Sequence, residues 1–143
     1  MRDALGGAVN IIIIVVFIVI VLGYLAFNVN YTKAFRMKDK IISIYNQYDG
    51  NCNSNCRSEI SAYERTIGYN PANMMCPTDY TRIDNSYCVK KNVVNSSKDS
   101  QYEGKERYYY SIITKINIEI PVIQNTLNLS VFQVTGNTKT YES

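Results

Sequence analysis

The sequence predicts an α+β fold, in which a small antiparallel sheet of about three strands packs on one long N-terminal helix and disulfides link the loops. Three observations lead to this prediction. A long apolar run opens the chain, hydrophobic residues then recur at helical spacing, and the last third alternates apolar and polar residues with the period of a strand. The chain has 143 residues, which is enough for one small domain besides the helix.

The apolar run is long enough to cross a membrane. No side chain between Asp3 and Lys33 carries a charge, and the stretch from Ile11 to Leu22 has no polar side-chain atom. A bilayer core of about 30 Å requires about 20 residues of helix. A cleaved signal peptide is the alternative, but its apolar core is shorter, at about 7–15 residues, and ends in small residues. We therefore expect a short flank over 1–7 and a transmembrane helix over 8–28.

The helix is expected to continue as an amphipathic stalk over 29–50. No Pro or Gly interrupts the chain from Tyr24 to Asp49, and Gly50 supplies a stop. The apolar stripe of this stalk consists of Tyr31, Ala34, Phe35, Ile41, Ile42, Tyr45 and Tyr48. Such a stripe must be covered by the C-terminal domain, by neighbouring copies of the chain, or by both.

Four cysteines, Cys52, Cys56, Cys76 and Cys88, fall in the middle of the chain. An even number in a small domain is typical of a disulfide framework. A zinc site and free thiols are the alternatives, although the eleven residues between Cys76 and Cys88 do not fit a zinc knuckle. We favour the local pairing, Cys52 with Cys56 and Cys76 with Cys88. Closure of the turn-rich loop between the second pair would stabilise the fold by roughly 3 kcal/mol.

The charged residues and the cysteines predict opposite sides of the membrane for the C-terminal domain. Four basic residues and one acidic residue follow the apolar run between 33 and 40, so the positive-inside rule places the C-terminal domain in the cytoplasm. Disulfides form in oxidising compartments, which places the same domain outside it. We give the cysteines more weight and predict a single-pass cell-membrane protein with an extracytoplasmic α+β domain over 51–143.

Inside this domain we expect one helix and three strands. Residues 58–68 have the pattern of a helix that Ser58 caps and Gly68 ends, with a buried face of Ile60, Tyr63 and Ile67. Residues 69–86 and 95–104 are expected to be loops.

The strands are expected over 86–94, 108–120 and 127–131. The second has the clearest signal, because apolar and mostly polar residues alternate along it until Pro121. Phe132 and Val134 shift the apolar face by one residue, which predicts a bulge, and Gly136 with Asn137 predicts a bend. We expect the stalk helix to cover the apolar face of this sheet.

The composition excludes several kinds of active site. The chain has no His, so neither a Ser-His-Asp nor a Cys-His arrangement can form, and no Gly-rich phosphate loop occurs. A formal charge of +3 is too small to indicate nucleic-acid binding. We expect no enzyme activity, cofactor, metal or small-molecule substrate. Tyr108, Tyr109 and Tyr110 form a candidate surface contact, although Tyr is also common in strands.

The layout resembles type IV pilin-like proteins and, among them, the TadE/TadF-type minor pilins. The likeness lies in LGGAVNIIIIVVFIVIVLGYLAF at the start and INIEIPVIQNTLNLSVFQVTGNTKTYE at the end. Gly6 and Gly7 are similar to the residues before the family's cleavage point, but the acid that follows in that family has no counterpart at Ile11 or Ile12.

This resemblance implies a membrane-anchored structural subunit of a bacterial surface filament or secretion machine. Its partners would be the membrane and other copies or related pilin-like subunits, which it would contact through its N-terminal helix. The implied assembly face comprises Ile11, Ile14, Phe17, Ile18, Val21, Tyr31, Phe35 and Ile42. The alternative is a monomeric, single-pass anchored ectodomain with a binding or adhesive role.

Overall fold

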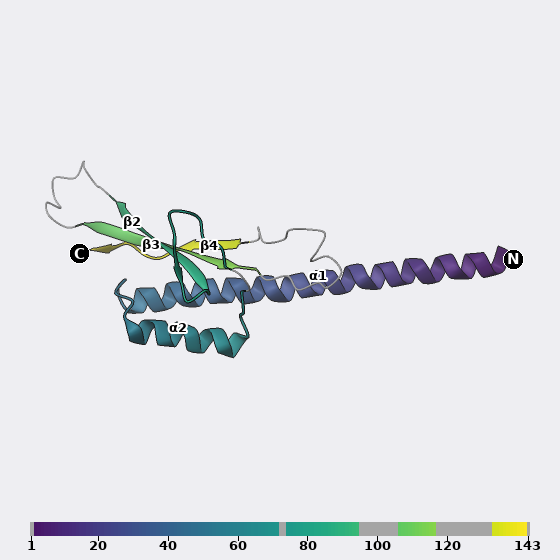
Figure 1. Cartoon of the computed structure of the whole chain (residues 1–143), viewed down its shortest axis with the longest axis horizontal. Helices are drawn as coiled ribbons and strands as arrows, with labels where there is room; N and C mark the ends of the chain where they lie inside the picture. Colours follow the sequence, from purple (N-terminus) through teal and green to yellow (C-terminus); the bar gives the residue numbers. More distant parts are fainter. Residues whose placement is uncertain (1, 72–73, 95–105, 117–132, 143) are drawn as a thin grey trace.

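The computed structural model describes residues 2–71, 74–94, 106–116 and 133–142. Its elements follow in the order α1 (Arg2–Gln47), α2 (Ser54–Ile67), β1 (Thr81–Ile83), β2 (Tyr87–Val94), β3 (Arg107–Lys115), β4 (Gln133–Asn137) and β5 (Tyr141–Glu142). Figure 1 shows α1 as a long rod whose second half is flanked by α2 and the sheet, while its first half projects alone. The predicted α+β class, with a long N-terminal helix, a small antiparallel sheet and two disulfides, is confirmed.

The first helix is continuous from the apolar run into the domain. It has 46 residues, which corresponds to a length of roughly 70 Å. The helix ends at Gln47, close to the predicted stop. Gly50 then adopts a left-handed φ of +79°, and its N–H donates to the carbonyl of Tyr45 at 2.9 Å. This bond satisfies one of the carbonyls that a helix end leaves without a partner.

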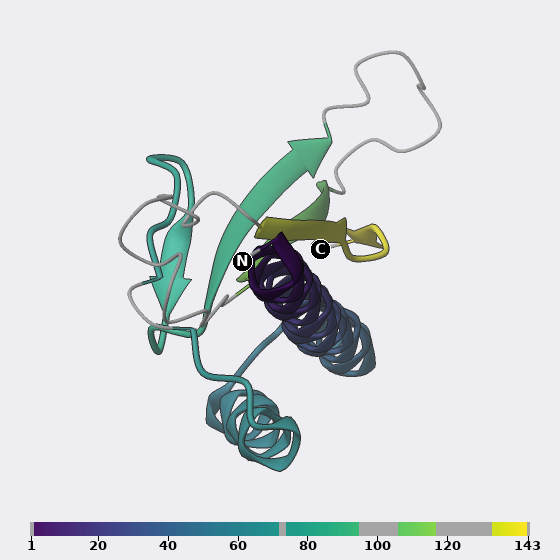
Figure 2. The same cartoon turned by 90° about the vertical axis from the view of Figure 1, so that its right-hand side faces the viewer.

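The buried stripe of α1 is rotated slightly from the predicted one. The residues buried in the domain are Ala34, Met37, Lys38, Ile41, Ile44 and Tyr45. Tyr31 and Phe35 are exposed instead, with 43% and 41% of their surface accessible. The difference arises because α1 is covered from two directions, by the sheet and by α2, as the view along its axis shows (Figure 2). The side of α1 that faces the sheet and α2 therefore forms part of the core.

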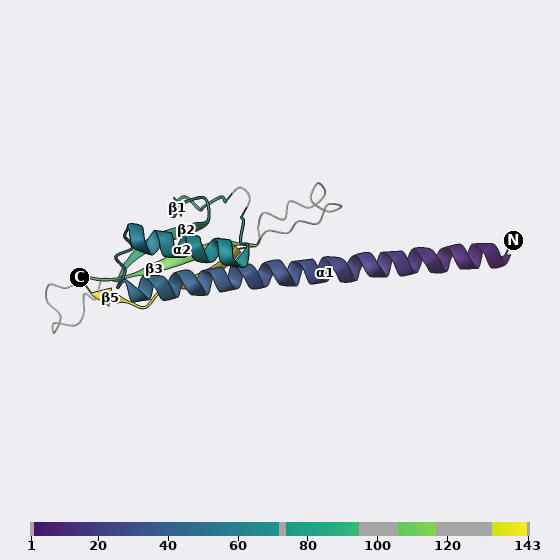
Figure 3. The same cartoon turned by 90° about the horizontal axis from the view of Figure 1, so that it is seen from below.

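The second helix begins earlier than predicted. Asn53, and not Ser58, is its cap, because the Asn53 side-chain oxygen accepts the N–H of Cys56 at 3.1 Å. The predicted end at Gly68 is confirmed, with a left-handed φ of +64°. Ile60 is buried, and Tyr63 and Ile67 are partly buried against the same core. Figure 3 shows α2 alongside the second half of α1.

The sheet has more strands than the three predicted. The described residues form five antiparallel strands in the order β1-β2-β3-β4, and β5 pairs with β3 next to β4. The strands predicted over 86–94 and 108–120 correspond to β2 and β3. The predicted strand over 127–131, the end of the second strand after 116, and Phe132 lie outside the described residues.

One loop prediction is wrong. Residues 81–83 form β1, where Thr81 pairs with Val89 and Ile83 with Tyr87, although 69–86 was expected to be loop. Gly136 and Asn137 are the last two residues of β4, and the chain leaves the strand directly after them before β5 begins at Tyr141. Gly136 also packs closely on α1, since a β-carbon there would lie 2.7 Å from Cδ1 of Ile42. The missing side chain lets this strand approach the helix closely.

The core has two parts, one on each face of the sheet. The larger part joins α1 and α2 to the sheet residues Tyr87, Val89, Ile112 and Ile116. The smaller part lies on the opposite face and consists of Met74, Cys88 and Ile113. The alternation predicted for 108–116 is therefore confirmed, but its second face also buries a cluster of its own.

Candidate functional site

The first half of α1 is an exposed apolar surface. An 18-residue window of it has a mean hydropathy of 3.1, and none of that window is buried within the part of the chain that the structure describes. By length and composition, α1 can therefore cross a membrane. The predicted assembly-face residues Ile11, Ile14, Phe17, Ile18 and Val21 all lie on this surface, with exposed fractions between 38% and 66%. A bare apolar surface of this length requires lipid or protein to cover it.

Aromatic side chains mark the point where the apolar run meets the domain. The rings of Phe27 and Tyr31 stack with centroids 6.2 Å apart, and Tyr31 and Phe35 stack at the same distance. The ammonium of Lys38 lies 4.0 Å from the Phe35 ring centroid and pairs with Asp39 at 3.2 Å. Exposed Tyr side chains such as Tyr31 are common at a membrane–water interface, whereas Lys38 is buried in the domain.

The predicted assembly face is not uniform in the second half of α1. Tyr31 and Phe35 lie on the surface, whereas Ile42 is partly buried and packs against the core of its own chain. The remaining exposed positions at helical spacing are polar, namely Thr32, Arg36, Asp39, Ser43 and Gln47. Beyond Phe35, the outward side of this helix is therefore suited to water.

The three tyrosines at 108–110 do not share one exposed surface. Tyr108 is buried, while Tyr109 and Tyr110 are partly buried. The Tyr108 ring lies 5.6 Å from that of Tyr141 and 5.8 Å from that of Tyr110, and Tyr110 lies 5.2 Å from Tyr45. The period of two places Tyr108 and Tyr110 on the same face as Ile112, so this signal was present in the sequence.

The cysteines form the predicted pairs. Cys52 is bonded to Cys56 and Cys76 to Cys88, with Cα atoms 5.1 and 5.7 Å apart. None of the four is free, which excludes the zinc and free-thiol alternatives. The second bond ties the segment after residue 74 to β2 and covers Ile113.

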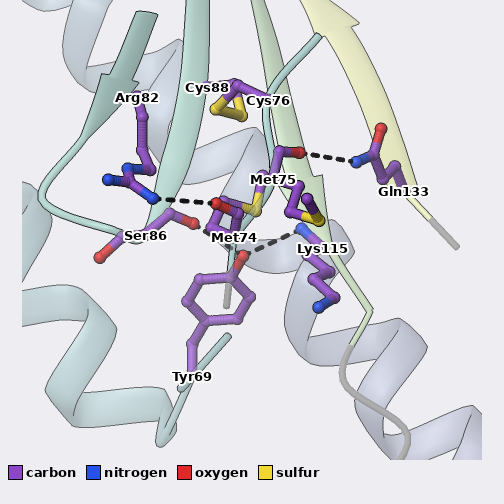
Figure 4. Close-up of a disulfide and its surroundings, with 9 residues drawn as sticks. All are labelled: Tyr69, Met74, Met75, Cys76, Arg82, Ser86, Cys88, Lys115 and Gln133. Carbon is purple, nitrogen blue, oxygen red and sulfur yellow. Dashed lines mark hydrogen bonds between the residues drawn. A yellow bond between two sulfur atoms is a disulfide. The ribbon is translucent and has the colours of Figure 1, made fainter. Parts of the chain in front are cut away.

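Hydrogen bonds hold the chain around this second disulfide in place (Figure 4). The guanidinium of Arg82 donates to the carbonyl of Met74 at 3.4 Å, and the amide of Gln133 donates to that of Met75 at 3.3 Å. The Tyr69 hydroxyl donates to the carbonyl of Ser86 at 2.9 Å and accepts the N–H of Lys115 at 3.0 Å. These bonds connect β1, β3, β4 and the turn before β2 to the loop, so the region is a structural clamp.

A partly buried carboxylate extends this clamp to α2. The Ser86 hydroxyl lies 2.8 Å from each carboxylate oxygen of Glu64 and donates to it. Burial raises the pKa of Glu64 and outweighs the bond from Ser86, which lowers that pKa. Burial also raises the pKa of Tyr69 well above its ordinary value of 10.0.

A groove of about 400 Å³ lies at the junction of α1 and α2, where the apolar run ends. Its lining residues are Asn28, Val29, Thr32, Lys33, Arg36, Thr66 and Ile67. Sequence reasoning missed this groove, because folding brings the end of α2 next to a helical turn that is about thirty residues earlier in the chain. The feature of the sequence that points to this groove is the cluster of basic residues that begins at Lys33.

Among the described residues, no group of three or more His, Cys, Asp or Glu side chains could hold a metal ion. No family model, curated protein or solved structure matches the chain.

Proposed function

We propose that the protein is a membrane-anchored structural subunit, which assembles with other copies or related pilin-like subunits through its N-terminal helix. The observation that carries the proposal is that the two halves of α1 have different surroundings. Its first half is apolar and bare, and its second half is the centre of a disulfide-bonded domain.

Energetics support the anchor. Apolar aliphatic and Phe side chains each favour membrane insertion by roughly 0.3–0.6 kcal/mol at the centre of a helix. The twelve residues from Ile11 to Leu22 are all of this kind. A helix also satisfies its own backbone hydrogen bonds in lipid, and this helix is continuous with the folded domain.

The two disulfides support an extracytoplasmic domain, because such bonds persist in oxidising compartments. The assembly role follows from the resemblance to pilin-like proteins and from the exposed aromatic surface of Tyr31 and Phe35. Inside the membrane, helices associate through close packing, since lipid is as apolar as their side chains. A subunit of a bacterial surface filament or secretion machine fits these features.

The polar outward side of α1 after Phe35 favours a second candidate, a monomeric anchored binding module. Arg36, Asp39 and Ser43 offer little apolar surface to a neighbouring copy. Under this alternative, the apolar half of α1 meets only lipid.

Counting subunits in native membranes distinguishes the two candidates. We expect the full chain to form oligomers in single-molecule photobleaching, and Phe35→Asp to disperse them, because a charge there opposes contact between copies. Ser43→Asp is the matched control, since it adds the same charge at another exposed position of α1. Monomers in the unaltered chain would contradict the assembly proposal and favour the binding module.

Immunogold labelling of intact cells with an antibody against the domain tests the side of the membrane. Label on filaments is expected under the assembly proposal. Label that requires permeabilisation would place the domain inside and contradict the extracytoplasmic orientation.

A further inference from the structure

The groove between α1 and α2 combines two cations with an apolar wall. Lys33 and Arg36 lie three residues apart, so they share one side of α1, and Thr32 lies beside them. Val29 and Ile67 add apolar surface. The volume of about 400 Å³ falls in the range of small-ligand sites, which is roughly 300–1,000 Å³.

Neither cation of the groove is neutralised by an ion pair within the described parts of the chain. The ion pairs there use Lys38, Lys90, Arg107 and Lys139 instead. The ammonium of Lys33 lies at the end of α2, 3.8 Å from where a β-carbon on Gly68 would be. The ammonium therefore lies beside the end of α2, and no ion pair among the described residues engages it.

The membrane side of the groove lies near the outer edge of the lipid headgroup layer. If residues 8–28 span the hydrocarbon, the rise of 1.5 Å per residue places the backbone of Thr32 and Lys33 about 6–8 Å beyond its edge and that of Arg36 about 12 Å beyond it. The headgroup layer is roughly 5–7 Å thick on each side. Side chains on a helix lean toward its N-terminus, which here is the membrane side, so Lys33 and Arg36 reach back toward the headgroups.

We propose that this groove binds the phosphate of a membrane phospholipid, with Lys33 and Arg36 holding the phosphate and Val29 and Ile67 contacting the start of the acyl chains. The inference rests on the proposed membrane anchoring. A lipid fits better than a soluble anion, because the apolar wall is continuous with the membrane-spanning run and needs an apolar ligand part. The bound lipid would tie α2 to the membrane surface and fix the tilt of the domain.

Native mass spectrometry of the full chain, released from micelles that contain phosphatidylglycerol, tests the site. We expect one retained phospholipid per chain. Lys33→Gln with Arg36→Gln should reduce that retention roughly tenfold or more, because both basic contacts to the phosphate are lost. Arg57→Gln with Lys91→Gln is the control, since it removes the same charge from exposed positions outside the groove lining and should leave retention unchanged.

A second variant tests the shape of the site. Thr66→Trp fills the groove, leaves both cations in place and should also abolish retention. Equal loss in the control pair, or full retention in Thr66→Trp, would show diffuse charge attraction and overturn the site. Competition by inorganic phosphate at a concentration equal to that of the lipid would also overturn it, because the ligand would then be a soluble anion.

Flotation with vesicles separates this inference from the proposed function. If the unaltered chain does not float with vesicles, the anchoring itself is wrong. If the chain floats but retains no phospholipid, only the groove assignment fails.

Discussion

Two buried tyrosines differ in the hydrogen bonding of their hydroxyl groups. The Tyr69 hydroxyl makes two hydrogen bonds, to Ser86 and Lys115. The Tyr87 hydroxyl is buried without a hydrogen-bond partner among the described residues, and the neighbouring Tyr45 affects its pKa without meeting hydrogen-bond geometry. The same substitution should therefore act differently at the two positions.

We expect Tyr69→Phe to lower the free energy of unfolding by about 1–3 kcal/mol, because it leaves a buried carbonyl and N–H without their partner. Tyr87→Phe should change that free energy by less than about 1 kcal/mol, or raise it, because only an unpaired hydroxyl is removed. Denaturant unfolding in detergent measures both. Equal losses in the two variants would contradict the assigned hydrogen bonds.

Glu64 gives the domain a specific pH dependence. Burial raises its pKa in the folded state above the ordinary value of 4.5. A carboxyl with a raised folded pKa adds stability that is complete below the unfolded pKa and is lost as the pH rises through the folded pKa. The stability of the unaltered chain relative to Glu64→Gln should therefore fall as the pH rises from about 4.5 toward neutral.

Thermal unfolding of both chains across this pH range measures the difference, in which the contributions of carboxyls that do not interact with Glu64 cancel. A difference that stays constant, or that grows with pH, would show that the pKa of Glu64 is not raised.

At the scale of elements, two glycines end helices with similar backbone angles but different surroundings. Gly50 and Gly68 have φ values of +79° and +64°. A β-carbon on Gly50 would lie 2.9 Å from the Tyr141 ring and 3.2 Å from Tyr110, whereas on Gly68 it would meet only Lys33 at 3.8 Å. At both positions the left-handed backbone would strain a residue with a side chain. Only at Gly50 would that side chain also be crowded by neighbouring atoms.

Gly68→Ala should lower the free energy of unfolding by about 1–2 kcal/mol, which is the cost of a left-handed residue with a side chain. Gly50→Ala should lower it by about 1–3 kcal/mol more, because two rigid rings must shift. Chemical denaturation of the pair isolates this extra cost. Equal losses of unfolding free energy in the two variants would show that the rings of Tyr110 and Tyr141 move aside for a methyl group at little cost.

The elements also show how far local signals determine this fold. The continuous helix, the end of α2 at Gly68, the alternation in β3 and the cysteine pairing follow from spacing and turn residues near each position. The cap at Asn53 was missed because Asn and Ser cap helices about equally well, so Ser58 was an equally plausible start. The three residues of β1 carry no strand pattern of their own, and they become a strand by pairing with β2.

The parts of the candidate site that could be predicted are those formed by residues close together in the sequence. The apolar residues between 11 and 22 identify the bare half of α1 directly from the sequence. Partial burial of Tyr110 and Ile42 depends on which side of α1 the sheet covers. The groove depends on Thr66 and Ile67 reaching α1 from another helix, and no periodicity reports such a contact.

For the whole molecule, the long helix divides into two halves with separate roles. Ile14 and Ile18 lie in the bare half, with 56% and 49% of their surface exposed, while Ile41 is completely buried in the domain. The first half should therefore determine membrane partition without affecting the stability of the domain, and the second half should do the reverse.

Replacement of Ile14 and Ile18 by Asp tests this division. Each acidic residue near the centre of a membrane-spanning helix costs roughly 2.5–3.5 kcal/mol of insertion free energy. The variant should leave the membrane fraction, but in detergent its domain should unfold at the same temperature as that of the unaltered chain. Ile41→Asp should stay in the membrane fraction and lose its cooperative unfolding, because a charge replaces a core side chain. If the first variant also lost domain stability, the two halves of α1 would be coupled, and the helix would transmit changes in the membrane to the sheet.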